Sequence, residues 1–425
     1  MKLVCAPKDY AFKGDSSVLD VVLYGKADRP MRGSVGAGIT NKMSHEKLCA
    51  ATRAWDFLSL VLSVTACDLA GHRNMSPDGW TREFDVEISV LDPVFWNSQQ
   101  KLVECILAFL TSDRWHINFV EGGISPSPPR QRVLPSEDCV ALLSGGLDSF
   151  IGNLDLVSEG HRPFAISQTV RGDAENQRLF AKIIGGGLRH LQVNHNAEVP
   201  KQESPPSQRA RSLVFFAYGV LAATTLKRYH DGKSVMLYVS ENGFISINPP
   251  LTGTRLGSLS TRTTHPVFVS LLQELLDNAG LRVRLENPYK LMTKGEMLRD
   301  CTNKTLLRTH ACNTTSCGRF KQFGYRHCGR CVPCLVRRAA FRSARIKDTT
   351  EYVYVDLGRD DPDHAGFDDV RSVAMALAEV KANGLETWIG TALSTSLLGD
   401  IGALQTMIGR GLDELGSLFK YYGVK

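Results

Sequence analysis

Long hydrophobic runs are missing from this sequence of 425 residues. No run approaches the roughly 20 apolar residues that a transmembrane helix needs, and the first residues lack the pattern of a secretory signal. We therefore expect a cytoplasmic protein without membrane contact. Since disulfides are rare in the cytosol, we do not expect the 11 cysteines to form them.

A strong excess of charge is missing too. The 50 lysines and arginines stand against 44 aspartates and glutamates, which leaves a net charge of +6. No basic run with interleaved aromatic residues occurs, so direct nucleic-acid binding is permitted but not indicated. The hydrophobic content of 43% is enough for a large core, and a chain of this length should form two or three domains.

The first positive signal is a glycine-rich turn between a strand and a helix. The apolar run Val140–Leu143 stops at this turn, and helical periodicity follows it. Backbone N–H groups and the positive end of a helix dipole meet at such a junction, which suits it to phosphate. It is not a Walker loop, because no Gly-Lys-Ser/Thr follows. The residues expected to hold the phosphates are Leu143, Ser144, Gly145, Gly146, Leu147, Asp148 and Ser149.

Residues 138 to 285 alternate between strand and helix patterns. Strands are predicted at 140–143, 164–166, 191–193, 235–239 and 283–285. Helices are predicted near 173–185, 208–229 and 267–279. This alternation is typical of an α/β fold, in which a parallel sheet has helices on both faces. Ligands of such sheets bind in the crevice beyond the carboxyl ends of the strands.

The loop after the fourth strand is long and polar. It runs from Ser240 to Pro266, and long irregular loops in compact domains are usually functional or disordered. Its composition suits an anionic substrate that forms hydrogen bonds. The candidate substrate-binding residues are Glu241, Asn242, Arg262 and His265. The alternative is a mobile surface loop.

Two further cations are candidates for the crevice. Arg209 and Arg211 do not share a helix face, so we expect one of them to point into the crevice and the other to be solvated. Thr293 is typical of a helix N-cap, which places Lys294 beside a positive helix end without a local partner. Lys294 is therefore predicted to contact a ligand phosphate or carboxylate, and simple exposure is the alternative.

The flanking regions carry weaker signals. Residues 1–135 predict an α+β domain without a cluster of acid, base or metal-ligating residues, so we interpret it as a scaffold or partner-docking domain. The proline-rich segment 122–136 is the expected linker. Residues 346–425 predict a strand-like Tyr352–Val355 and then helices at 367–381 and 396–421. The last helix has one apolar face, which should pack on the body of the protein or, alternatively, on a partner.

A cluster of cysteines is the second strong signal. Cys328, Cys331 and Cys334 have CxxCxxC spacing, and Cys317 is the expected fourth ligand. Such turns bring sulfurs to the ~3.7 Å separation that tetrahedral Zn–S bonds of about 2.3 Å require. Four thiolates without an open position indicate a structural zinc site, with an iron–sulfur cluster as the alternative. Cys312 is the alternative fourth ligand, and the neighbouring His327 is expected at the surface.

These motifs together resemble the QueC family, the 7-cyano-7-deazaguanine synthases. Ser144–Ser149 matches the SGGxDS pyrophosphate loop (PP-loop) of ATP-dependent adenylating enzymes, and Thr314–Cys317 matches T-x-[ST]-C. Cys328–Arg337 matches CGxCxxCxxR, and Thr293–Glu296 is similar to a late Asn-Lys-x-Glu. The resemblance covers about 138 to 345. It implies an adenine nucleotide α-hydrolase-like, Rossmann-like domain at 136–345 with a four-cysteine zinc site within 312–334.

The chain departs from the QueC pattern at two places. Only Arg211 matches in the family's Pro-Gly-Arg-Asn, and the family's Asp-x-x-Tyr-Pro-Asp-Cys-Arg substrate loop is replaced by Asn248–Pro266. The added domain 1–135 and the helical region 346–425 resemble QatC, the QueC-like component of Qat anti-phage defence systems. That resemblance implies three partners: an ATPase, a second Qat protein and a TatD-type nuclease.

The resemblance also implies a reaction. ATP would bind with Mg²⁺ on the PP-loop, and Asp148, Lys294 and Arg211 would be catalytic. A 7-carboxy-7-deazaguanine-like carboxylate would become an acyl-adenylate, and an amine would then give an amide, a nitrile or a protein conjugate. The alternatives are a PP-loop RNA-modifying enzyme of the thiolation type and a non-catalytic ATP-binding subunit of a defence complex.

Overall fold

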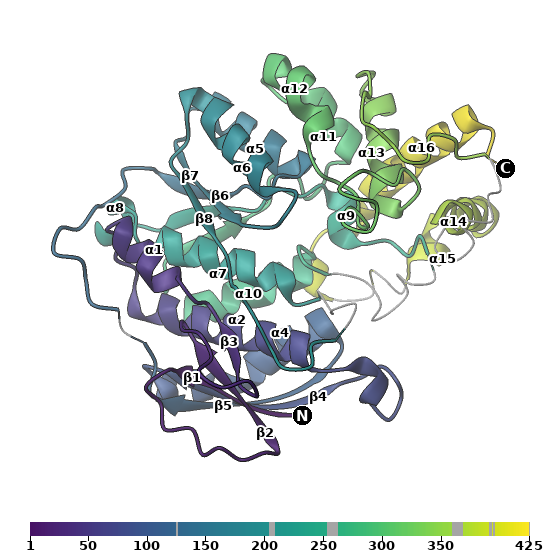
Figure 1. The fold of residues 1–425 in the computed structure, drawn as a ribbon. Helices are drawn as coiled ribbons and strands as arrows, with labels where there is room; N and C mark the ends of the chain where they lie inside the picture. Colours follow the sequence, from purple (N-terminus) through teal and green to yellow (C-terminus); the bar gives the residue numbers. More distant parts are fainter. Residues whose placement is uncertain are drawn as a thin grey trace.

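Two five-stranded parallel sheets lie on either side of a helical layer in the computed structural model (Figure 1). The structure describes residues 1–124, 126–203, 209–252, 262–358, 369–390, 393 and 396–424. The part of the predicted substrate loop at 253–261 lies outside these ranges.

The sheet that carries the glycine-rich turn has the order β10-β9-β6-β7-β8, and its strand pairs are parallel. Its strands are β6 (Cys139–Leu142), β7 (Pro163–Gln168), β8 (His190–Val193), β9 (Val235–Tyr238) and β10 (Val283–Glu286). All five lie where the apolar runs predicted them. The chain leaves the central strand β6 toward β7, whereas β9 lies on the other side of β6, so the order reverses there. Ligands of doubly wound sheets bind at such a reversal.

Helices cover both faces of this sheet, as the alternating pattern predicted. α5 (Leu147–Ser158) and α6 (Ala174–Ile183) lie on one face, and α7 (Arg211–Ala223) and α10 (Pro266–Asn278) lie on the other (Figure 1). The short α8 (Lys227–His230) follows α7. The central strands β6 and β7 are therefore buried along their whole length, which explains why their sequences are largely apolar, whereas buried and half-buried residues alternate along β8 and β9.

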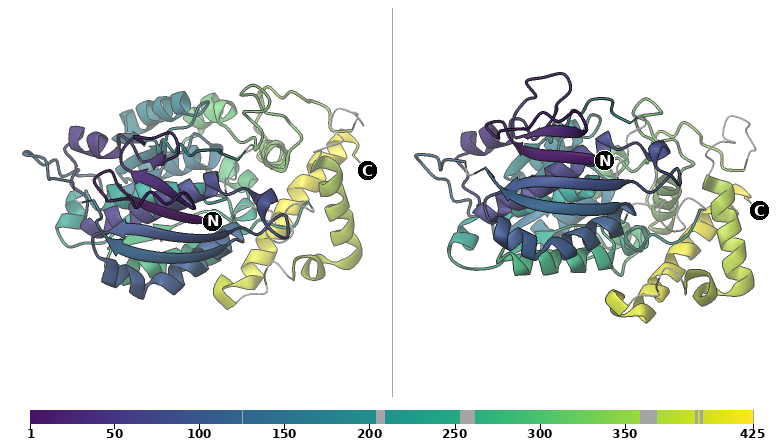
Figure 2. Two further views of the ribbon diagram at one scale, coloured as in Figure 1. Left: turned by 60° about the horizontal axis from the view of Figure 1, so that its bottom comes forward. Right: turned by 90° about the horizontal axis from the view of Figure 1, so that it is seen from below.

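The N-terminal sheet has the order β3-β2-β1-β4-β5 and is also parallel. Its strands are β1 (Lys2–Pro7), β2 (Val18–Leu23), β3 (Gly33–Val35), β4 (Glu83–Val90) and β5 (Arg114–Glu121). α1 (Ile39–His45), α2 (Thr52–Ala70), α3 (Pro93–Ser98) and α4 (Gln100–Thr111) complete this part. Buried and exposed residues alternate along β4 and β5, and one face of the sheet lies open in Figure 2.

One hydrophobic core joins the two sheets. α2 packs against α7, and α4 packs against α10, so the helical layer between the sheets comes from both parts of the chain. A single cluster of buried side chains runs from Leu3 and Phe84 through Leu62 and Phe216 to Val140. The predicted boundary near residue 135 thus separates two sheets that share their core. The boundaries between the three predicted domains stay predictions.

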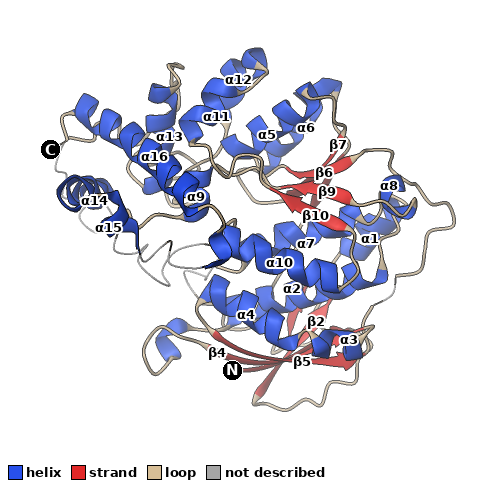
Figure 3. Cartoon of the chain, turned by 180° about the vertical axis from the view of Figure 1, so that it is seen from behind, coloured by secondary structure: helices blue, strands red, loops and turns tan. Residues whose placement is uncertain are grey.

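The remaining helices lie toward the side of the molecule that carries the C-terminal end (Figure 3). They are α9 (Gly243–Ile247), α11 (Lys294–Asp300), α12 (Lys304–His310), α13 (Val332–Ser343), α14 (Asp369–Asn383), α15 (Leu385–Ile389) and α16 (Ile401–Tyr422). Short 3₁₀ turns lie at Arg73–Met75, Ile184–Gly186, Ala311–Asn313 and Ser396–Leu398.

The apolar face of α16 packs on the body of the protein, as predicted. It contributes to a second hydrophobic cluster with α9, α13 and α14. The strand expected at Tyr352–Val355 is absent from the described structure, where Tyr352 forms only an isolated bridge with His327. Over the described ranges, no helix is both long and apolar enough to cross a bilayer.

Candidate active site

The glycine-rich turn lies between β6 and α5, at the reversal of strand order. Gly145 has a φ of +91°, and a Cβ there would lie 3.2 Å from the Cβ of Asp173, so glycine avoids both strain and crowding. Gly146 is the N-cap of α5, and no side chain of the described ranges caps this helix. The first N–H groups of α5 are therefore available to an anion.

Hydroxyl groups brace the turn from inside. Ser149 Oγ accepts from the N–H of Ser144 at 3.1 Å and donates to the Gly146 carbonyl at 3.0 Å. Ser144 Oγ accepts from the Gly146 N–H at 3.2 Å. From outside, the Thr315 N–H donates to the Gly145 carbonyl at 3.1 Å. Because these bonds fix the backbone before a ligand arrives, the turn is preorganised for phosphate.

Asp148 is the centre of a buried polar cluster. One carboxylate oxygen pairs with the Lys294 ammonium, and the other accepts the backbone N–H and side-chain amide of Asn242 at 3.0 and 2.7 Å. Burial alone would raise the pKa of Asp148, but the Lys294 charge and hydrogen bonds from Glu241 and Asn242 lower it to about 2. Lys294 is buried, so the alternative of simple exposure is wrong, and its contact with a ligand stays a prediction.

Glu241 is the second carboxyl group of this cluster. It accepts a hydrogen bond from the Asn242 amide at 3.1 Å and is hydrogen-bonded to Asp148. Burial raises the pKa of Glu241 well above its ordinary value, and the negative charge of Asp148 raises it further. Two adjacent negative charges are thus disfavoured here unless a cation lies beside them. Two adjacent carboxyl groups beside a phosphate-binding turn fit the oxygen ligands that Mg²⁺ prefers.

Two cavities flank the turn, and Arg211 lines both of them. The first, of about 300 Å³, lies where β6 and β9 end, and it is lined by Ser144, Ser149, Phe215, Phe216 and Glu241 among others. The second, of about 520 Å³, lies where β7 and β8 end, and Gln168, Asp173 and His195 line it together with Thr65 and Asp68 of α2. The N-terminal part therefore supplies one wall of the second cavity.

Arg209 precedes α7 and Arg211 is its first residue. Their side chains separate as predicted, but Arg209 is buried, so the expectation that it is solvated is wrong. Arg211 faces the cavities, and burial lowers its pKa although the charge of Asp173 opposes this effect. Arg209 turns away, stacks on Trp80 at 4.5 Å and donates to the Thr111 carbonyl at 3.1 Å. Arg209 therefore serves the packing of the N-terminal part rather than the crevice.

Arg262 and His265 both contact Phe109 of α4. Arg262 donates to the Phe109 carbonyl at 3.2 Å and lies over its ring, and His265 packs on the same ring. His265 also caps α10 by accepting from the Val267 N–H at 3.3 Å. Both residues are thus held by their surroundings, and contact with substrate stays a prediction for them.

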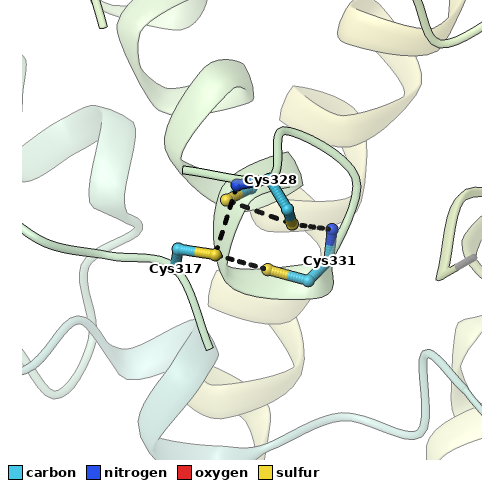
Figure 4. Close-up of side chains that lie close together, drawn as sticks. Cys317, Cys328 and Cys331 are labelled. Carbon is cyan, nitrogen blue, oxygen red and sulfur yellow. Dashed lines mark hydrogen bonds between the residues drawn. The ribbon is translucent and has the colours of Figure 1, made fainter. Parts of the chain in front are cut away.

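The four predicted metal ligands come together. The sulfurs of Cys317, Cys328, Cys331 and Cys334 lie within 4.8 Å of one another, and all four residues are buried. Figure 4 labels the first three of them. Two of the sulfur pairs are 3.9 Å apart, close to the ~3.7 Å edge of a zinc–thiolate tetrahedron. Cys312 points elsewhere, since its sulfur contacts Lys347, Asp348 and Thr349. The donor set fits a structural zinc ion with Cys317 as its fourth ligand.

Arg337 explains the residue types around Cys317. Its guanidinium is fully buried and donates to the hydroxyls of Thr314 and Ser316 at 2.9 and 3.0 Å and to the Ala311 carbonyl at 2.8 Å. The segment fixed in this way includes Thr315, which bonds the glycine-rich turn. The cysteine cluster and the glycine-rich turn are therefore linked through hydrogen bonds of the segment Thr314–Cys317. The sequence did not predict this role of Thr315.

His327 differs from the prediction that it lies at the surface. It is only 6% exposed, and its Nε2 accepts from the Ser316 N–H at 3.1 Å. Burial lowers the pKa of His327 to about 4, so the ring is neutral at physiological pH. The aromatic neighbours Phe320 and Tyr352 enclose it. It supports the cysteine turn and is not among the four clustered ligands.

Comparison with known proteins agrees with this geometry. Residues 263–345 match the family described as "Queuosine biosynthesis protein QueC". Half of the chain is similar to 7-cyano-7-deazaguanine synthases. The enzyme of Methanococcus aeolicus is 23% identical over 236 residues, which are 50% of this chain and 98% of the relative. The enzymes of Acetivibrio thermocellus and Caldicellulosiruptor bescii are 25% and 27% identical over 50% of this chain and 97% and 96% of the relatives.

These relatives are matched almost end to end by half of this chain. The other half therefore has no counterpart in them. The homology supports an ATP-dependent PP-loop synthase, and the buried cysteine cluster supports a zinc-binding segment.

Proposed function

We propose that this chain is an ATP-dependent ligase that activates a 7-carboxy-7-deazaguanine-like carboxylate as an acyl-adenylate. The observation that carries the proposal is the Asp148–Lys294–Asn242 cluster placed directly against a braced, glycine-rich turn. Such an arrangement offers backbone N–H groups, a cation and carboxyl oxygens within one small site. Similarity to 7-cyano-7-deazaguanine synthases supplies the substrate class.

The residues have separate tasks in this mechanism. The turn Ser144–Ser149 binds the ATP phosphates, and Asp148 and Glu241 would hold Mg²⁺, which would offset phosphate charge. The substrate carboxylate attacks the α-phosphorus, an acyl–O–P bond forms, and pyrophosphate leaves. Lys294 and Arg211 stabilise the negative charge that develops during this step. Because AMP is a much better leaving group than hydroxide, the activated carbonyl is open to an amine.

The second step joins the activated carbonyl to an amine and releases AMP. With ammonia the product is an amide, which a second ATP can convert to a nitrile. For this chain, a protein amine in an anti-phage complex of the Qat type is the acceptor that we propose. The partners would then be an ATPase, a second Qat protein and a TatD-type nuclease. The unmatched half of the chain supports this extension, because it provides surface that the compact relatives lack.

An RNA thiolation activity is less well supported. It would need a reactive cysteine outside the metal cluster. Cys301 is 1% exposed in an apolar core, where burial and the charge of Asp155 raise its pKa to about 12. Cys312 bonds the backbone near Lys347. Neither residue lines one of the two cavities beside the turn.

The proposal is tested by incubating the full chain with ATP, Mg²⁺ and 7-carboxy-7-deazaguanine and measuring AMP and pyrophosphate. We expect carboxylate-dependent release of both. Lys294→Ala should lower kcat about 100-fold, because it removes one charged donor from the transition state. The control is Lys2→Ala, which removes an exposed cation on the N-terminal sheet. Turnover in the absence of carboxylate, or full turnover by Lys294→Ala, would contradict the proposal.

A further inference from the structure

The C-terminal helix α16 touches the helix that carries Lys294. Thr293 is the N-cap of α11, and it forms a capping box with Glu296. The Glu296 N–H donates to the Thr293 hydroxyl at 3.1 Å, and the Thr293 N–H donates to the Glu296 carboxylate at 2.8 Å. Lys294 is the first residue of α11, so the position of this cap fixes the position of the Lys294 backbone and the direction of its side chain.

Glu414 of α16 extends the cap from outside. Its carboxylate accepts a hydrogen bond from the Thr293 hydroxyl at 2.5 Å. The Gly295 N–H and the Ser343 hydroxyl also favour its charged form and act to lower its pKa. A carboxylate at a helix N-terminus satisfies donors that the helix itself leaves unpaired and interacts favourably with its dipole. The residue is held there although its charge is costly to bury, since burial raises its pKa.

Arg410 holds the other half of the same capping box. Its guanidinium donates to the two carboxylate oxygens of Glu296 at 2.6 and 3.3 Å and to the Leu291 carbonyl at 2.9 Å. Arg410 and Glu414 are four residues apart and therefore lie on one face of α16. Glu414 and Arg410 of α16 thus bond Thr293 and Glu296, the two residues of the capping box.

Glycines let α16 come this close. A Cβ on Gly295 would lie 2.2 Å from a Glu414 carboxylate oxygen, and a Cβ on Gly411 would lie 2.2 Å from the Phe244 ring. Phe244 belongs to α9, whose N-cap Asn242 bonds Asp148. One C-terminal helix therefore packs against both short helices that position partners of Asp148.

We propose that Glu414 is a positioning residue, which sets Lys294 against Asp148 and the ATP phosphates by capping α11. The C-terminal region then forms part of the working active site, although it carries none of the residues that touch substrate. The inference rests on the proposed function, because Lys294 is the cation of that mechanism.

A double-mutant cycle tests this role in the full chain. Glu414→Ala should lower kcat for carboxylate-dependent ATP–pyrophosphate exchange about 10-fold, because a displaced cation stabilises the transition state less well. In the Lys294→Ala background, Glu414→Ala should cause no further loss of kcat, since both changes remove the same interaction. Glu414→Gln keeps one hydrogen-bond acceptor, so its kcat should lie between those of the wild type and Glu414→Ala. It replaces the alanine variant if that variant does not fold.

Asp413→Ala is the matched control, because Asp413 lies on the same helix but is exposed. It should exchange at the wild-type rate. Full kcat in Glu414→Ala and Glu414→Gln, or an equal additional loss in the Lys294→Ala background, would overturn the inference alone. Wild-type rates in Lys294→Ala would instead overturn the proposed function. Calorimetric affinity for Mg-ATP should weaken about threefold in Glu414→Ala, and this readout needs no carboxylate substrate.

Discussion

The two parallel sheets of this protein have the same number of strands but very different carboxyl edges. At the end of β4, Asp56 accepts the N–H groups of Leu91 and Asp92 at 2.8 and 3.2 Å and the indole of Trp96 at 3.1 Å. At the end of β6, no side chain within the described ranges caps α5, and cavities lie beside the turn.

The difference teaches that a fold does not define a function by itself. A buried aspartate at each edge collects several donors. Asp56 accepts hydrogen bonds from structural donors next to its own sheet, whereas Asp148 bonds a lysine and an asparagine beside a phosphate-binding turn. The first arrangement stabilises structure, and the second prepares a site for a charged ligand.

Replacing each of the two aspartates by asparagine should give the largest difference between the two edges. Asp148→Asn should lower kcat about 100-fold, because the neutral amide neither holds Mg²⁺ nor orients Lys294. Asp56→Asn should leave kcat of the folded protein unchanged but cost about 1–3 kcal/mol of stability, because its buried donors lose a charged acceptor. Steady-state kinetics and urea unfolding measure the two effects. Equal losses of activity in both variants would break the comparison.

The cysteine cluster should give the next largest effect. We expect about one zinc ion per chain by elemental analysis, since four buried thiolates complete a tetrahedral shell. Cys331→Ser should lose this zinc, lower the melting temperature and weaken ATP binding through the Thr315–Gly145 contact. Cys105→Ser, which changes an exposed cysteine, is the control. Iron with visible absorption would instead identify an iron–sulfur cluster.

The shared core predicts that the two sheets unfold together. Leu62 of α2 is fully buried between them, so Leu62→Ala should cost about 2–5 kcal/mol. Scanning calorimetry should show one transition that moves to lower temperature as a whole. Leu134→Ala, at a residue that is 43% exposed, should leave it in place. Two separate transitions in the wild type would show that the sheets fold independently.

The smallest effect is expected at the turn itself. Gly145→Ala places a Cβ at a positive φ and should cost about 1 kcal/mol of stability. The new Cβ would also crowd Asp173. We therefore expect the free energy of ATP binding to weaken by more than the free energy of unfolding decreases. Calorimetric titration with Mg-ATP checks this. Unchanged affinity would show that the turn does not contact the nucleotide.

Features with a local cause were predictable from the sequence. The central strands β6 and β7 are largely apolar because both faces of the sheet are covered there, and the CxxCxxC spacing is set by the turns between ligands. Thr293 was recognised as an N-cap because capping needs only neighbouring residues. In each case, a few consecutive residues contain the physical reason for the structure.

Features that depend on distant segments were not predictable. Asp148 and Lys294 were each candidates, but 146 positions separate them and nothing local indicates the pair. His327 has a polar side chain, yet Phe320 and Tyr352 enclose it. Tyr352–Val355 alternates like a strand but finds no partner strand within the described structure. Glu414 carries no local signal, because its function depends on helix packing.

The most direct test of the central claim is exchange of labelled pyrophosphate into ATP by the full chain. With Mg²⁺ and 7-carboxy-7-deazaguanine present, the label should enter ATP, and Asp148→Ala should abolish its entry while Asp413→Ala does not. Exchange that ignores the carboxylate, or that persists in Asp148→Ala, would contradict the assignment of this site to carboxylate adenylation.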